Sequence, residues 1–290
     1  MRFLRIMRKP TGGPRSRGAT DKIADRQGWK AAVRPTRGEK SRAPVEEVHR
    51  IRVLAKRLCA YLRLFRGTAP EKALEIEEKR IRRIAESLGR VRDETVCLQT
   101  LRWLAGKENE ESHRKWLREA LAHFSDSARG DGDPRTIGRA RIAIEARRLR
   151  LLALIDEHPP QERRLEELLR REYGKSRQAM REAVREGSPE AFHRWRKRVK
   201  RLTYQTEIFS ASPRRSLARL EAKFIRLGKL LGRLQDLQVL KRWIEAQPIA
   251  SERKLLPLIE GWMGRYRQET ERAGGRCFRM GKAEFLSLLR

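Results

Sequence analysis

Apolar residues recur every three or four positions along almost the whole chain after residue 43, which is the spacing of one face of an α-helix. Proline and glycine clusters interrupt this pattern, as in the segments 130–134 and 158–160. No convincing run of alternating β-branched residues appears, so we predict an all-α fold. The pattern predicts helices over residues 44–65, 70–105, 109–128, 137–156, 161–186, 188–210, 213–246 and 251–273.

Two sequence blocks occur twice in the chain. The block HRIRVLAKRL at 49–58 aligns with HRWRKRVKRL at 193–202, which begins 144 positions later. The block LGRVRDETV at 88–96 aligns with LGRLQDLQV at 231–239, which begins 143 positions later. Because the two separations are nearly equal, we interpret the chain as two similar helical halves produced by duplication. The halves are placed at residues 19–157 and 161–275, between a basic disordered arm (1–18) and a C-terminal extension (276–290).

The first repeated block predicts a helix with two different faces in each half. Apolar residues fall on one arc, which we expect to face the core, and cations fall on the opposite side. A solvated face is the ordinary interpretation of a charge run, but solvated faces usually mix signs because like charges at i,i+4 repel. No acidic residue occurs between Arg50 and Arg66, or between His193 and Gln205. We therefore expect an anion to neutralise two cationic ridges, formed by His49, Arg52, Lys56 and Arg63 and by His193, Arg196 and Lys200.

The net charge of the chain points to the same kind of partner. The 290 residues include 70 Lys and Arg against 38 Asp and Glu, a formal net charge of +32. Such a balance favours an acidic or polyanionic partner. The first 42 residues hold 13 of the cations and three acidic residues, with one short helix expected at 21–33. The rest of the positive charge therefore belongs to the helical body.

The apolar runs and the cysteines exclude several classes of protein. The longest apolar run, residues 151–155, is far too short to cross a bilayer, so we expect no membrane partner. The N-terminus lacks the continuous apolar stretch of a secretory signal. Three well-separated cysteines cannot form a disulfide framework or a four-ligand zinc site, which indicates a reducing compartment. We therefore expect a cytoplasmic protein.

At the repeated blocks the chain resembles the CHAD family. The motifs HxxRxxxKRL and LGRxxDxxV each occur in both halves, in the same order. The resemblance implies two four-helix bundles related by a pseudo-two-fold axis, with basic helices lining a central cleft or pore that binds inorganic polyphosphate. It also implies association with polyphosphate granules. The ligand-facing residues that it implies are His49, Arg52, Lys56, Arg57, His193, Arg196, Lys200 and Arg201, to which we add Arg63 and Lys197 from the same helices.

Two further residue types in these blocks call for a role. We expect Asp93 and Asp236 to orient an arginine or histidine of the ridges, although a surface carboxylate is the alternative. We expect His49 and His193 to donate hydrogen bonds to phosphate rather than to act as catalysts. Protonation of these histidines would then strengthen binding below pH ~6.5.

The leading hypothesis is a non-catalytic polyphosphate-binding protein that uses no cofactor and no metal. Free sulfate or phosphate ions are expected to mimic the ligand. One alternative is nucleic-acid binding through the same basic surface, although we expect nucleic acid only as a weaker competitor because stacking aromatics are scarce. The other alternative is a metal-dependent polyphosphate or triphosphate hydrolase, which requires convergent carboxylates that the sequence does not display.

Overall fold

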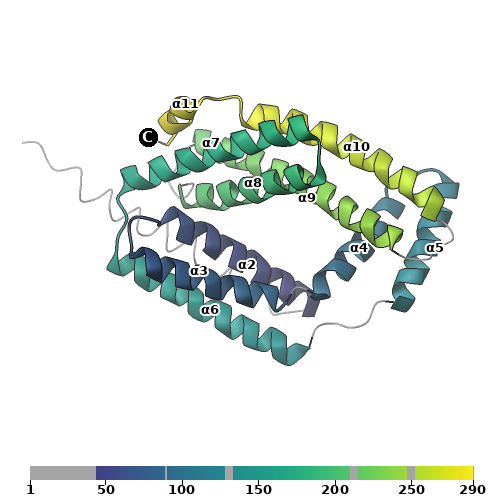
Figure 1. Cartoon of the computed structure of the whole chain (residues 1–290), viewed down its shortest axis with the longest axis horizontal. Helices are drawn as coiled ribbons and strands as arrows, with labels where there is room; N and C mark the ends of the chain where they lie inside the picture. The colour runs from purple at the N-terminus through teal and green to yellow at the C-terminus, as the bar shows by residue number, and fades with distance from the viewer. Residues whose placement is uncertain (1–43, 89, 128–132, 210–214, 247–251, 290) are drawn as a thin grey trace, which may run out of the picture.

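The computed structural model describes residues 44–88, 90–127, 133–209, 215–246 and 252–289, and within these ranges it contains helices and no strand. The predicted all-α fold is confirmed. The arm predicted at 1–18 and the helix predicted at 21–33 lie outside the described residues. The helices are α2 (Pro44–Leu64), α3 (Glu71–Glu86), α4 (Arg90–Ala105), α5 (Glu111–Ser127), α6 (Pro134–Glu157), α7 (Glu162–Glu186), α8 (Pro189–Phe209), α9 (Arg215–Glu245), α10 (Glu252–Cys277) and α11 (Lys282–Ser287) (Figure 1).

The two copies of the repeated helix, α2 and α8, begin with the same kinds of residue and bury corresponding faces. Each has proline at its first position and a glutamate in its first turn, where the missing N–H and the helix dipole favour these residues. The predicted apolar arc is buried in both copies, which confirms the division of each helix into two faces. The buried residues are Val48, Ile51, Ala55, Leu58, Leu62 and Phe65 in the first copy and Phe192, Trp195, Val199, Leu202, Thr206 and Phe209 in the second.

Helices α2 and α8 also pack directly against each other. The Gln205 side chain donates a hydrogen bond to the carbonyl oxygen of Ala60 at 2.9 Å. The Tyr61 hydroxyl donates to Glu207 at 3.1 Å. Gln205 occupies the position of α8 that corresponds to Tyr61 in α2, so the copies meet at matching positions. The pseudo-two-fold axis itself stays a prediction.

Two apolar cores hold the helices together, and α9 runs through both. The larger core joins α2, α3, α6, α7 and α8 with the N-terminal part of α9, the end of α10 and α11. The smaller core joins α4 and α5 to the C-terminal part of α9 and the beginning of α10. In Figure 1, α4 and α5 accordingly lie at one end of the molecule, beside α9 and α10. Two helices of the predicted first half thus pack on helices of the second.

One predicted element is wrong in its extent. Residues 70–105, predicted as a single helix, form α3 and α4, which belong to different cores. The Ser87 hydroxyl donates to the Ile84 carbonyl oxygen at 2.9 Å, and Gly89 follows two residues later, so this segment has a weak preference for continuing the helix. The matching Gly232 lies inside the unbroken α9, where the neighbouring Leu231 and Leu234 are both buried. Tertiary packing therefore decides whether the helix continues through this block, as it does in α9 but not between α3 and α4.

Candidate functional site

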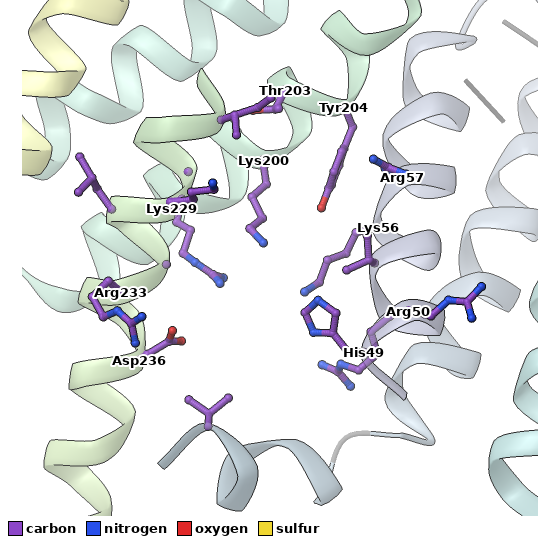
Figure 2. Close-up of a pocket in the computed structure, with 18 of the residues that line it drawn as sticks. His49, Arg50, Lys56, Arg57, Lys200, Thr203, Tyr204, Lys229, Arg233 and Asp236 are labelled. Atoms are coloured by element: carbon purple, nitrogen blue, oxygen red, sulfur yellow. The ribbon is translucent and has the colours of Figure 1, made fainter. Parts of the chain in front are cut away.

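A pocket with a volume of about 1160 Å³ lies between α2, α8 and α9, and side chains of α4 and α10 complete its lining (Figure 2). Eight Lys and Arg residues line it against four Asp and Glu residues, so its wall carries an excess of four positive charges before His49 is counted. The cationic residues are Arg50, Arg52, Lys56 and Arg57 from α2, Arg196 and Lys200 from α8, and Lys229 and Arg233 from α9.

The first ridge reaches the pocket along one side of α2. Figure 2 shows His49 and Lys56, which are two turns apart, pointing into the cavity. Arg52 lies between them, and its Nη1 donates to the carbonyl oxygen of Ala85 in α3 at 2.7 Å. That bond fixes the guanidinium at the pocket wall. The opposite face of α2 is buried in the larger core, and this packing fixes the rotation of the helix so that its cationic row faces the pocket.

The second ridge supplies the facing wall through α8. Lys200 extends into the cavity from the side opposite Lys56 (Figure 2). Arg196 lies one turn earlier, and its Nη2 is 4.0 Å from the position that a Cβ would take at Gly232 of α9. A Cβ there would make only ordinary van der Waals contact, so the guanidinium lies beside α9 at this glycine. The structure therefore brings His49, Arg52, Lys56 and Arg57 into one cavity with Arg196 and Lys200.

Helix α9 contributes two cations that our sequence analysis missed. Lys229 and Arg233 are four residues apart, which places them on one face of the helix, and both line the pocket. Arg233 also lies over the ring of Trp103, 4.1 Å from its centroid, which holds the guanidinium in place. The signal was present in the sequence, because Arg233 belongs to the second repeated block.

Four of the predicted ligand residues lie outside this pocket. Arg63 points to Glu78 of α3, donating from Nε at 2.8 Å and from Nη2 at 2.5 Å. Arg201 donates to Glu172 of α7 at 3.4 Å. His193 Nδ1 forms a hydrogen bond with Gln235 Oε1 of α9 at 2.6 Å, and Lys197 is exposed on α8.

The two predicted orienting aspartates have different outcomes. Asp236 lines the pocket, one turn from Arg233 on the same side of α9 (Figure 2). The side chain of Asp93 lies outside the described part of α4. An orienting role for either residue stays a prediction.

Glu207 and Tyr204 line the pocket where α2 meets α8, and the buried Tyr61 contacts Glu207 there. Glu207 accepts hydrogen bonds from Arg57 Nη2 at 3.3 Å and from the Tyr61 hydroxyl at 3.1 Å. The Arg57 guanidinium also lies 5.7 Å from the centroid of the Tyr204 ring. Burial raises the pKa of Tyr204, and it also raises the pKa of Glu207 above the usual value although the charge of Arg57 opposes this.

His193, predicted as a hydrogen-bond donor to phosphate, instead contacts Gln235 of α9 and does not line the pocket. Burial lowers its pKa below the usual value, and the charges of Lys197, Arg196 and Arg242 add to this effect. The hydrogen bond with Gln235 only partly opposes the shift. The imidazole is therefore neutral at neutral pH, and it binds a neighbouring helix instead of the cavity.

The described residues contain no group of three or more His, Cys, Asp or Glu side chains arranged to hold a metal ion. They also contain no helix with the length and apolar character needed to cross a membrane.

Comparison with known proteins gives one match. The family model described as CHAD domain matches residues 20–245, which include α2 to α9 and all but one of the residues lining the pocket. No curated protein and no solved structure matches the chain.

Proposed function

Because the chain belongs to the CHAD domain family, which is known for binding polyphosphate, we propose that its pocket binds inorganic polyphosphate without changing it chemically. One observation carries this proposal. Both copies of the duplicated ridge, which are 144 residues apart in the chain, direct cations into the same cavity, and α9 adds two more. The two copies of the repeat therefore contribute to one cavity, which has cationic side chains on several sides.

The wall has the chemistry that a chain of phosphates requires. Arginine forks bind two phosphate oxygens at once, and the lysines act as mobile point charges. Cations on three helices can contact successive phosphates of a flexible polyanion, and each contact releases a counterion. The walls of the pocket partly shield a bound ligand from bulk water, which strengthens each charge–charge contact. Association with polyphosphate granules in the cell would follow from this binding.

The test is a competition at equal phosphate concentration. The full-length protein is bound to labelled long-chain polyphosphate and challenged with unlabelled polyphosphate, single-stranded RNA or duplex DNA. We expect unlabelled polyphosphate to displace the label at a concentration at least about tenfold lower than either nucleic acid, because a confined cavity admits a thin chain better than a duplex or stacked bases. Equal displacement by RNA or DNA would show that the site is not selective.

The non-catalytic part of the proposal has its own measurement. Polyphosphate incubated with the protein and Mg²⁺ or Mn²⁺ should release no more orthophosphate than polyphosphate alone. Sustained, protein-dependent release would establish a hydrolase instead.

A further inference from the structure

The duplication reverses a charge at one position of the pocket. Counting 144 positions from Arg63 of α2 gives Glu207 of α8. Arg63 lies outside the pocket, whereas Glu207 lines it. The copy of the helix that faces the cavity at this position therefore carries a carboxylate where the other copy carries a guanidinium. A carboxylate in a cavity proposed for a polyanion requires an explanation.

The contacts of Glu207 show which groups around the pocket it binds. Its Oε1 accepts from Arg57 Nη2 at 3.3 Å, and its Oε2 accepts from the Tyr61 hydroxyl at 3.1 Å. Only 20% of its side chain is exposed, so its charge is weakly screened by water. The carboxylate therefore cancels much of the charge of Arg57, which is one of the cations of the pocket.

The charged and titratable groups around Glu207 come from α2, α8 and α9. Arg57 and Tyr61 belong to α2, Tyr204 lies one turn before Glu207 in α8, and Glu221 belongs to α9. Burial and the charge of Glu221 raise the pKa of Glu207, while Arg57 and the Tyr61 hydrogen bond oppose them. The balance lies above the usual pKa of a glutamate, so Glu207 takes up its proton at a less acidic pH than an exposed glutamate does.

We propose that Glu207 is an affinity-lowering residue of the pocket, whose ionised carboxylate weakens polyanion binding by repelling phosphate and by holding Arg57. This inference rests on the proposed function. When Glu207 gains a proton, the repulsion disappears and Arg57 becomes available to a phosphate oxygen. Binding therefore strengthens as the pH falls through the pKa of this carboxyl group.

The experiment measures the affinity of the full-length protein for long-chain polyphosphate at constant salt, from pH ~8 to pH ~5. Glu207→Gln preserves the shape of the side chain and an oxygen acceptor for Tyr61 while it removes the charge. At pH ~8 we expect this variant to bind about tenfold more tightly than wild type, the difference shrinking toward pH ~5. The matched control is Glu190→Gln, which removes an exposed carboxylate from the same helix but outside the pocket and should change the affinity by less than about twofold.

A second variant keeps the inference testable if Glu207→Gln does not fold. His49 also lines the pocket, and histidine is the side chain that ordinarily titrates near neutral pH, so His49→Gln removes any contribution of this residue to the pH profile. Binding by His49→Gln should still strengthen toward pH ~5. A flat profile in this variant, or equal affinities of Glu207→Gln and wild type at every pH, would overturn the inference. Failure of wild type to bind polyphosphate at any pH would instead overturn the proposed function.

Discussion

At the scale of single residues, Glu78 is a buried carboxylate outside the pocket that connects α2 to α3. Its side chain is 6% exposed and accepts from three arginines, of which Arg63 belongs to α2, Arg66 follows that helix and Arg82 lies in α3 itself. Burial alone would raise the pKa of Glu78, but the hydrogen bonds and charges of Arg63 and Arg82 outweigh it, and the pKa is lowered. One buried carboxylate thus holds the end of α2 against α3.

Glu78→Gln should therefore lower the free energy of unfolding by about 3 kcal/mol at neutral pH, because it leaves partly buried guanidinium groups without their counter-charge. Urea denaturation measures this, and Glu75→Gln on the exposed side of the same helix should cost less than about 0.5 kcal/mol. A lowered carboxyl pKa stabilises the fold above the usual pKa of 4.5, and this stabilisation is lost as the pH falls through the folded value. The difference between Glu78→Gln and wild type should consequently shrink in acid. An undiminished difference there would contradict the role of the ionised group.

The same residue shows why part of the site could not be predicted from sequence. Helical spacing placed Arg63 correctly on the cationic side of its helix. Its partner Glu78 lies on another helix, so only the packing of α2 against α3 reveals that Arg63 is paired. Arg52 and Lys56 needed no such knowledge, because the burial of the opposite face directs them into the pocket.

At the scale of elements, two adjacent glycines in α10 test how that helix is fitted to α7 and α8. A Cβ at Gly274 would come within 2.7 Å of the fully buried Trp195 ring and 3.0 Å of the Met180 sulfur. A Cβ at Gly275 would have no heavy atom within 4 Å, apart from its own chain neighbours and helix backbone.

Gly274→Ala should lower the free energy of unfolding by about 2 kcal/mol, because the close packing around Trp195 must shift. Gly275→Ala should raise it by about 0.5–1 kcal/mol, since alanine is the better helix former and meets nothing. Thermal or urea unfolding followed by circular dichroism distinguishes the two variants. Equal effects would mean that α10 does not lie against Trp195 as described.

Tertiary contacts determine where a helix begins and ends more than they determine whether it forms. Periodicity predicted the positions of most helices to within a few residues, and α2 and α8 carry the apolar faces expected of them. Periodicity did not separate α3 from α4, because both sides of the break carry helical spacing and only the membership of two cores distinguishes them. It also did not predict α11, which is six residues long and is held to the larger core by Phe285.

At the scale of the whole molecule, a formal net charge of +32 attracts any polyanion. Such attraction acts over the whole surface and is strongly screened by salt. The account requires something more specific, namely that cations inside the pocket contribute more than equal charges elsewhere. The effect of a cation's position on binding must therefore be measured separately from the effect of the total charge.

Lys200 and Lys197 allow this separation on a single helix. Lys200 extends into the pocket (Figure 2). Lys197 is exposed and does not line the pocket. Lys200→Glu and Lys197→Glu change the net charge by the same amount, so general attraction to a polyanion is the same in both variants.

The most direct measurement is the dissociation constant of both variants and of wild type for long-chain polyphosphate at near-physiological salt, with circular dichroism to confirm equal helix content. We predict that Lys200→Glu weakens binding by at least about tenfold, a loss of about 1.4 kcal/mol, while Lys197→Glu stays within about twofold of wild type. Equal weakening by the two substitutions would contradict a pocket-centred site and leave only the charge of the surface.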